Sequence, residues 1–224
     1  MAQKNVVLTF DDACVNHLTQ VVPLLKELGF GGTFFISTPA VWNEKFPGAF
    51  LDGEGISAIH RAGFEIGNHT VNHPDLRSKS EEECRREISE LNNFLQNYGI
   101  PEPVSFAYPG GPYAGNAVPV LRECGVRFAR TTERALWHKN TDLYRIPCFS
   151  VCEKEAAHFS EAMEALENSA DENSAAVLLY HGVPDEPHPW CSTPWELFEE
   201  QMRFLAARDI RAWSMRDFGT FIEA

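Results

Sequence analysis

The chain has 224 residues, of which 44% are hydrophobic and 23% are charged. This length suits one domain with a substantial core, and no apolar run is long enough to span a bilayer. The 32 acidic and 19 basic side chains give a net charge of −13, which disfavours nucleic acid and anionic membranes as partners. We therefore expect a single domain over residues 1–224 that binds a neutral or cationic ligand.

Strand-like and helix-like segments alternate along the chain. Short apolar runs predict the strands, and apolar residues that recur every three or four positions predict the helices. The predicted strands are 6–10, 32–36, 64–67, 104–107, 126–129, 144–146, 175–180 and 210–213. The predicted helices are 17–28, 54–62, 80–98, a segment through 118–121, 155–168, 194–207 and 215–222. The sequence Ser80-Glu81-Glu82-Glu83 predicts a capping box at the start of one helix.

Seven or eight βα units without a linker favour an α/β barrel rather than an open sheet. Four polar residues and a proline lie at or just after the C-terminal ends of the predicted strands. They are Asp11, Asp12, His69, Pro109 and His181. In a barrel those strand ends share one rim, so we expect these residues to meet at one pocket.

The N-terminal residues and the cysteines indicate the compartment. Residues 1–5 lead directly into the first apolar run and show no secretory signal, so we expect a cytoplasmic location. The six cysteines are scattered and no pair has CxxC spacing, which favours free thiols over disulfides.

Two of the strand-end residues, Asp12 and His69, and the nearby His73 predict a metal site. His69 and His73 are spaced i, i+4, and Asp12 adds a carboxylate. Two imidazoles and a carboxylate form an open ligand set for a divalent metal, which leaves positions for water and a substrate oxygen. Asp11 and His181 then remain to move protons, so the inventory fits metal-assisted hydrolysis.

Three motifs in this order resemble the polysaccharide deacetylase family, which is also called carbohydrate esterase family four or the chitooligosaccharide deacetylase homology domain. TFDD at 9–12 resembles the first motif, HTVNH at 69–73 the second, and LYH at 179–181 the late LxH motif. Order and spacing agree over nearly the whole chain. The resemblance implies a distorted (β/α) barrel of seven or eight strands.

The resemblance also implies a role for each motif residue. Asp12, His69 and His73 would be the ligands of a divalent metal, commonly zinc. Asp11 would be the general base and His181 the general acid. Elementary chemistry supports this division, because an acetamide is a poor electrophile with a poor leaving group. A metal addresses the first problem, and each proton transfer is typically worth ~10²–10⁴ in rate.

The third family motif departs from its usual form. Many members carry an arginine there that pairs with the base, whereas the sequence FAYPGG at 106–111 has none and resembles a subgroup with FAYP at this place. Arg130 is our first candidate for the partner of Asp11, and Arg145 is the second. The Asp-rich fourth motif, which often partners the acid histidine, is not recognisable.

The same loop and the aromatic residues supply candidate substrate contacts. By resemblance, the N–H of Gly110 would face the developing oxyanion, with Tyr108 and Pro109 beside it. Trp190, just beyond His181, is a further candidate because aromatic faces suit sugar rings. The loop aromatics Trp42, Phe46 and Phe50 could serve likewise or only anchor their loop, and His188 is either a polar contact or a solvated loop residue.

We therefore expect a metal-dependent hydrolase that removes acetyl from an N-acetylated amino sugar or oligosaccharide. With no secretory signal visible, a soluble oligosaccharide, a nucleotide sugar or a glycan precursor is favoured over a cell-wall polymer. Two alternatives stay open: a ureide or cyclic-imide amidohydrolase on the same fold, and a non-catalytic carbohydrate-binding relative. The sequence does not specify the sugar, the metal or the oligomeric state.

Overall fold

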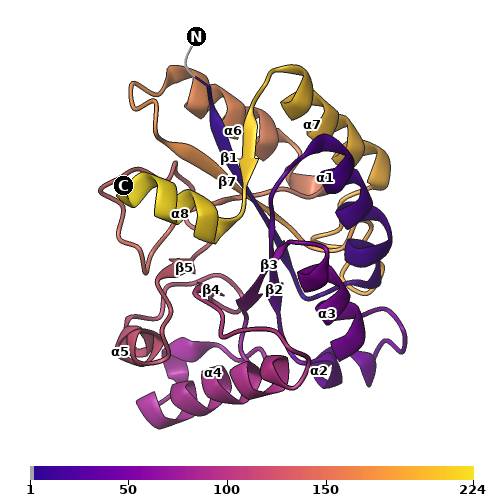
Figure 1. Cartoon of the computed structure of the whole chain (residues 1–224), viewed down its shortest axis with the longest axis vertical. Helices are drawn as coiled ribbons and strands as arrows, with labels where there is room; N and C mark the ends of the chain where they lie inside the picture. The colour runs from indigo at the N-terminus through magenta and orange to yellow at the C-terminus, as the bar shows by residue number, and fades with distance from the viewer. Residues whose placement is uncertain (1–2) are drawn as a thin grey trace.

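Strands and helices alternate along residues 3–224, the part of the chain that the structure, a computed structural model, describes (Figure 1). The strands are β1 (Asn5–Asp11), β2 (Thr33–Ile36), β3 (Glu65–Asn68), β4 (Ser105–Ala107), β5 (Phe128–Arg130), β6 (Phe149–Ser150), β7 (Ala175–Tyr180) and β8 (Arg211–Trp213). The α-helices are α1 (Val22–Leu28), α2 (Pro39–Asn43), α3 (Gly53–Arg61), α4 (Glu81–Gln96), α5 (Val118–Glu123), α6 (Ala157–Asn168), α7 (Trp195–Ala207) and α8 (Met215–Glu223). No helix within residues 3–224 combines the length and the apolar character that a membrane crossing requires.

The strands form one parallel sheet that curls into a half-barrel, so the predicted distorted α/β barrel is confirmed. The order is β5-β4-β3-β2-β1-β7-β6, and β8 pairs with the first half of β1. The segment 143–150 links the two edges of this sheet. The backbone N–H of Ala129 in β5 donates to Leu143 O at 2.7 Å, and Phe149 pairs with Leu178 in β7.

The predicted strand 144–146 is wrong. Ile146 makes only an isolated parallel bridge with Arg130, and the edge strand β6 begins later, at Phe149. The intervening residue is Pro147, which has no N–H to donate to a ladder and so interrupts strand pairing.

The predicted helix 17–28 is present but irregular. It begins as a π-helical turn over His17–Val21 and becomes the α-helix α1 at Val22. Pro23 cannot donate the hydrogen bond that a regular turn would need, and the wider π turn accommodates it. The sequence led us to expect a loop at Pro39–Asn43, where the structure has the short helix α2.

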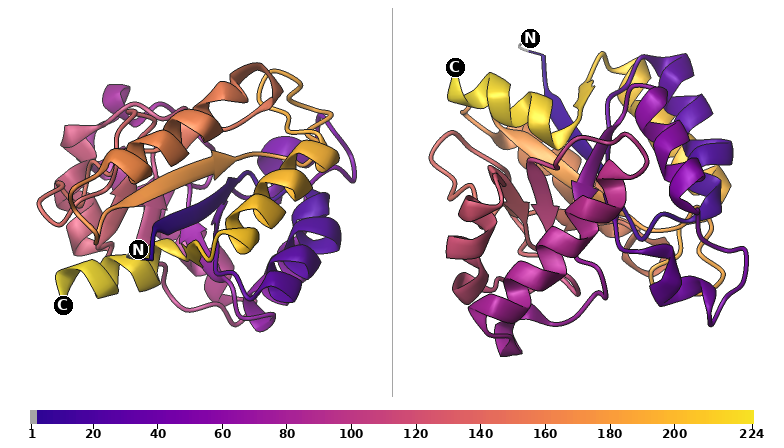
Figure 2. Two further views of the ribbon diagram at one scale, coloured as in Figure 1. Left: turned by 90° about the horizontal axis from the view of Figure 1, so that it is seen from above. Right: turned by 60° about the horizontal axis from the view of Figure 1, so that its bottom comes forward.

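Side chains along the strands alternate between the barrel interior and the helix-covered outer face. On β1, Val6 and Leu8 belong to the large core beneath the surrounding helices, whereas Val7 belongs to a second core inside the barrel with Phe35 and Leu179. Figure 2 shows β1 and β7 side by side with the helices outside them. Interior and exterior are thus set by the two-residue period of each strand.

The helix α8 closes the end of the barrel at which the strands begin. Met215 and Phe218 of this helix lie in the interior core. Glu65, the first residue of β3, accepts hydrogen bonds from Thr33 Oγ1 at 2.6 Å and from the backbone N–H of Arg216 at 2.9 Å. With this end closed, the opposite end is the one that holds an open pocket.

We predict that Ser80→Ala lowers the free energy of unfolding by about 1 kcal/mol. The predicted capping box is present: Ser80 Oγ accepts from Glu83 N at 3.2 Å, and the Glu83 carboxylate accepts from Ser80 N at 2.8 Å. Urea unfolding measures the loss, and Ser80→Asp, which keeps a capping oxygen, serves as the control. Equal stability of the alanine and aspartate variants would contradict the role of the cap.

Candidate active site

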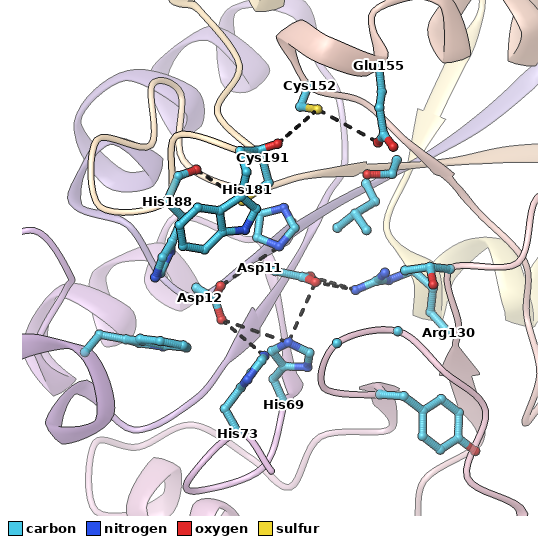
Figure 3. A pocket seen from close by; sticks show the side chains of 18 residues that line it. Asp11, Asp12, His69, His73, Arg130, Cys152, Glu155, His181, His188 and Cys191 are labelled. Atoms are coloured by element: carbon cyan, nitrogen blue, oxygen red, sulfur yellow. Dashed lines mark hydrogen bonds and ion pairs between the residues drawn. The ribbon is translucent and has the colours of Figure 1, made fainter. Parts of the chain in front are cut away.

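The alternation of strand side chains brings four polar residues to one end of the barrel. Residues that point into the barrel are two positions apart along each strand. At the end of four strands, or just after it, the last inward-pointing residue has a polar side chain. The inward pairs are Thr9 and Asp11, Gly67 and His69, Phe128 and Arg130, and Leu179 and His181. All four polar side chains line one pocket, as the positions of the strand ends predicted (Figure 3).

Asp12, His69 and His73 form the cluster that the sequence predicts for a metal. One ligand atom from each lies within 4.8 Å of the others. Asp12 Oδ1 is 4.0 Å from His69 Nε2 and 3.9 Å from His73 Nε2. This oxygen is buried and accepts no hydrogen bond within the described residues. A buried carboxylate oxygen without a partner is costly and two imidazole nitrogens lie near it, so the three residues fit a divalent metal.

The pKa shifts of these three groups also favour a bound metal ion. Burial raises the pKa of Asp12 well above its usual value, and the neighbouring Asp11 carboxylate adds to this shift. A bound cation would offset both effects. Burial lowers the pKa of His69 to about 3 and also lowers the pKa of His73. Neutral imidazoles keep the lone pair that a metal needs.

A turn after β3, not a helix, presents the two histidines. Thr70 and His73 have positive φ angles of 69° and 54°. Asn68 Oδ1 accepts from Thr70 N at 2.8 Å, and Thr70 Oγ1 accepts from His73 N at 3.0 Å, so local side chains hold this strained backbone. His69 Nδ1 lies 2.7 Å from Ala107 O and must donate to it, which leaves His69 Nε2 free to coordinate.

Arg130 holds the carboxylate of Asp11, as we expected for its first candidate partner. Arg130 Nη2 donates to Asp11 Oδ1 at 2.8 Å and to Oδ2 at 2.6 Å, and both side chains are buried. Burial alone would raise the pKa of Asp11, but the guanidinium beside it brings the pKa below its usual value. Asp11 is therefore ionised. Arg145, the second candidate, pairs instead with Glu133 at 2.7 Å.

We predict that Arg130→Met moves the acidic limb of the pH–rate profile to higher pH. Without the guanidinium, the effect of burial on the pKa of Asp11 is no longer opposed, so Asp11 becomes protonated at a higher pH and stops acting as a base there. The dependence of kcat/KM on pH measures the shift. Arg145→Met, which removes an exposed ion pair, should leave that limb in place. An unmoved limb in Arg130→Met would contradict the pairing.

His181 lies directly after β7, with its Nε2 4.0 Å from Asp12 Oδ2. Burial lowers the pKa of His181 below its usual value, although Asp11 and Asp185 act in the opposite direction. The protonated form is thus a stronger acid than an ordinary histidine. No arginine or lysine forms an ion pair with Asp12 in the described part of the chain, where its ionic contacts are with imidazoles.

Two residues that follow Asp12 fix the loop that carries His181. His17 Nε2 donates to the backbone carbonyl of His181 at 2.9 Å, and His17 is fully buried. Asn16 Nδ2 donates to Pro184 O at 2.6 Å, and Asn16 Oδ1 accepts from Val183 N at 3.1 Å. Sequence analysis missed both residues. Their place four and five residues after Asp12 was the one signal, and it does not reveal a contact with a loop more than 160 residues away.

We predict that His17→Phe lowers kcat by about tenfold with little change in stability. Phenylalanine fits among the neighbouring rings of Phe10 and Phe34, but it leaves the His181 carbonyl without its donor. The stability cost is limited because His17 Nδ1, which is buried without a partner, disappears at the same time. Turnover, metal content and urea unfolding are the measurements. Tyr180→Phe, which removes a buried hydrogen bond to Gln201, is the matched control for stability.

The loop after β4 reaches the pocket through its glycines. Gly110 and Gly111 line the pocket, and the N–H of Gly110 makes no hydrogen bond within residues 3–224. Its φ of 69° suits glycine, and the free N–H is available to an oxyanion. Tyr108 turns its hydroxyl away, donating to Tyr144 O at 2.9 Å, and Pro109 is not among the residues that line this pocket.

The remaining candidates differ in their surroundings. Trp190 lines the pocket at its rim and is 63% exposed. Trp42 lines the pocket, whereas Phe46 and Phe50 do not. His188 is not a solvated loop residue, because it is buried and lines the pocket. All six cysteines are free thiols, as expected.

Comparison with known proteins identifies the family. The sequence model of the polysaccharide deacetylase family matches residues 1–129, which is more than half of the 224 residues. The matched part contains Asp11, Asp12 and both histidine ligands of the predicted metal. The chain therefore belongs to the polysaccharide deacetylase family. Its place in a subgroup with FAYP stays a prediction.

The relatives include enzymes of known type. A peptidoglycan-N-acetylglucosamine deacetylase of Bacillus cereus is 29% identical over 62% of this chain and 59% of that protein. A chitooligosaccharide deacetylase of Rhizobium leguminosarum bv. trifolii is 32% identical over 41% of this chain and 40% of that protein. The chain thus spans less than two thirds of either relative. The solved structure of Bacillus subtilis PdaA, a family 4 carbohydrate esterase, shares the fold with a TM-score of 0.65 at 20% identity, covering 98% of this chain and 82% of that one.

Proposed function

We propose that this protein is a metal-dependent hydrolase that removes the acetyl group from an N-acetylated amino sugar or oligosaccharide. One observation carries the proposal. The same pocket holds a carboxylate oxygen of Asp12 that needs a cation and a second carboxylate, Asp11, that Arg130 keeps ionised. A binding site needs only the first, whereas hydrolysis also needs a base. Family membership and the deacetylase relatives support the choice of an acetamide.

Asp12, His69 and His73 would hold the metal. We propose zinc, because carboxylate oxygen and imidazole nitrogen are common zinc ligands. When bound, the metal would polarise the amide carbonyl and make a water molecule more acidic.

The remaining polar groups divide the proton transfers. Asp11, ionised and fixed by Arg130, accepts the proton of the attacking water. His181 Nε2, on the other side of Asp12, gives a proton to the departing amine nitrogen. The free N–H of Gly110 donates a hydrogen bond to the oxygen on which negative charge develops. Asp11 thus acts on the water, His181 on the amide nitrogen and Gly110 on the amide oxygen.

The charges in the pocket favour a neutral saccharide. Among the lining residues that the structure describes, Arg130 is the only arginine or lysine, and Asp11 already occupies it. No free arginine or lysine is left among these residues to bind a phosphate. We therefore propose a neutral N-acetylated saccharide rather than the nucleotide sugar that the sequence left open.

We predict that Asp12→Ala loses bound metal and activity together, whereas Asp11→Asn keeps the metal while turnover falls by at least about 10²-fold. The reason is that Asp12 supplies a ligand oxygen and Asp11 a proton acceptor. Metal analysis of the purified variants and acetate release measure the two effects. Wild-type-like turnover in Asp11→Asn would remove the base assignment.

Acetate release from a panel of N-acetylated sugars tests the reaction itself. Glucosamine oligomers without acetyl groups are the matched control, since they offer the same rings without the scissile bond. Ring opening of a cyclic imide, measured in parallel, distinguishes the alternative amidohydrolase. Tight sugar binding with no product from any compound would indicate a binding protein instead.

A further inference from the structure

A second imidazole reaches the pocket from the loop after β7. His188 is only 6% exposed, and four aromatic rings surround it at centroid distances of 4.9 to 5.8 Å. These rings belong to Trp42, Phe46, Phe50 and Trp190. Figure 3 shows His188 on the same side of the pocket as Asp12 and His73, opposite Arg130. The loop therefore holds this ring in one place beside the metal cluster.

Asp185 determines which nitrogen of His188 is left for a ligand. Its buried carboxylate accepts from His188 N at 2.9 Å, and its Oδ2 lies 3.5 Å from His188 Nδ1. Burial would raise the pKa of Asp185, but the hydrogen bonds from His188 lower it, so the group is a carboxylate. A carboxylate can only accept, so Nδ1 carries a proton and points to Asp185. No group within residues 3–224 hydrogen-bonds to His188 Nε2.

The indole of Trp42 adds a donor at the same place. Trp42 Nε1 is buried and has no hydrogen-bond partner among the described residues. Its ring packs edge-on against His73 at 5.3 Å and against His188 at 4.9 Å. Buried N–H groups are rarely left unpaired in folded proteins, so an atom from outside the chain is the natural partner.

We propose that Trp42 Nε1 and His188 Nε2 together bind one hydroxyl group of the substrate, on the His73 side of the metal cluster. A hydroxyl accepts from the indole N–H and donates to the imidazole nitrogen at the same time. A carboxylate cannot donate and an ammonium cannot accept, so neither satisfies both atoms. The inference rests on the proposed function in taking the pocket as a saccharide site. It makes these two residues the source of discrimination between hydroxylated and plain acetamides.

Binding measurements test the assignment without turnover. The Asp11→Asn chain, loaded with metal, is titrated calorimetrically with N,N′-diacetylchitobiose and with N-cyclohexylacetamide, whose ring carries no hydroxyl. Trp42→Phe and His188→Phe, each added to this background, should weaken binding of the sugar by roughly three- to tenfold. Binding of the hydroxyl-free amide should stay within about twofold. The double variant should lose little more than either single one, because both contacts serve one hydroxyl.

Phe46→Leu is the matched control, because it alters the ring cage around His188 without removing a polar atom. Metal content and urea unfolding show that each variant is folded, and Trp42→Phe keeps the test decisive if His188→Phe does not fold. Unchanged sugar affinity in the folded variants would overturn the assignment. An equal loss for both ligands would also overturn it, since the residues would then act on structure alone. Sugar binding without acetate release by the unmutated chain would refute the deacetylase and leave the hydroxyl site standing.

Discussion

Two adjacent carboxylates are buried at the end of one strand, and the rest of the site follows from how each is compensated. Asp11 and Asp12 are 3% and 4% exposed, in a place where neither could stay ionised alone. Arg130, which lies 119 residues further along the chain, reaches Asp11 because β5 and β1 open onto the same pocket. Asp12 has imidazoles around it but forms no ion pair with an arginine or lysine of the described residues. The protein thus supplies a cation for Asp11 and leaves Asp12 for a metal. The two neighbouring carboxylates can therefore have different chemical roles.

The parts of this design that are local in sequence could be predicted. Strand periodicity placed Asp11, His69 and His181 at one rim, and Arg130, at the end of the next strand-like run, was the first candidate for the partner of Asp11. The irregular elements could not be predicted in the same way. Pro147 interrupts the pairing expected at 144–146, and a π turn replaces the first turn of a predicted helix. Both depend on how neighbouring backbone adjusts to proline.

Contacts between loops were harder to predict from the sequence than the irregular elements. Nothing in the pattern around Asn16 or His17 indicates that they bond to the backbone after β7, and His188 gave no sign of being enclosed by aromatic rings. Asp185 explains why these features belong together: its carboxylate accepts from Gly182 N at 3.2 Å as well as from His188 N. One buried aspartate therefore shapes the loop on which the positions of both His181 and His188 depend. Such a hub is recognised from burial, which sequence alone does not report.

The position of β1 has a consequence for synthesis. This strand ends at Asp11, directly before Asp12, and pairs along one edge with β2, but its other neighbours β7 and β8 come from the far end of the chain. The side chain of Trp213 donates a hydrogen bond to that of Asn5 across 208 residues. The interior beneath the aspartates is filled by α8, the last helix. A growing chain on the ribosome can pair β1 with β2 early, but the partners of the other edge of β1 do not yet exist, and folding is delayed by these long-range pairings. Chaperones that shield exposed strand edges should matter more for this architecture than for one in which every strand pairs only with strands close to it in the chain.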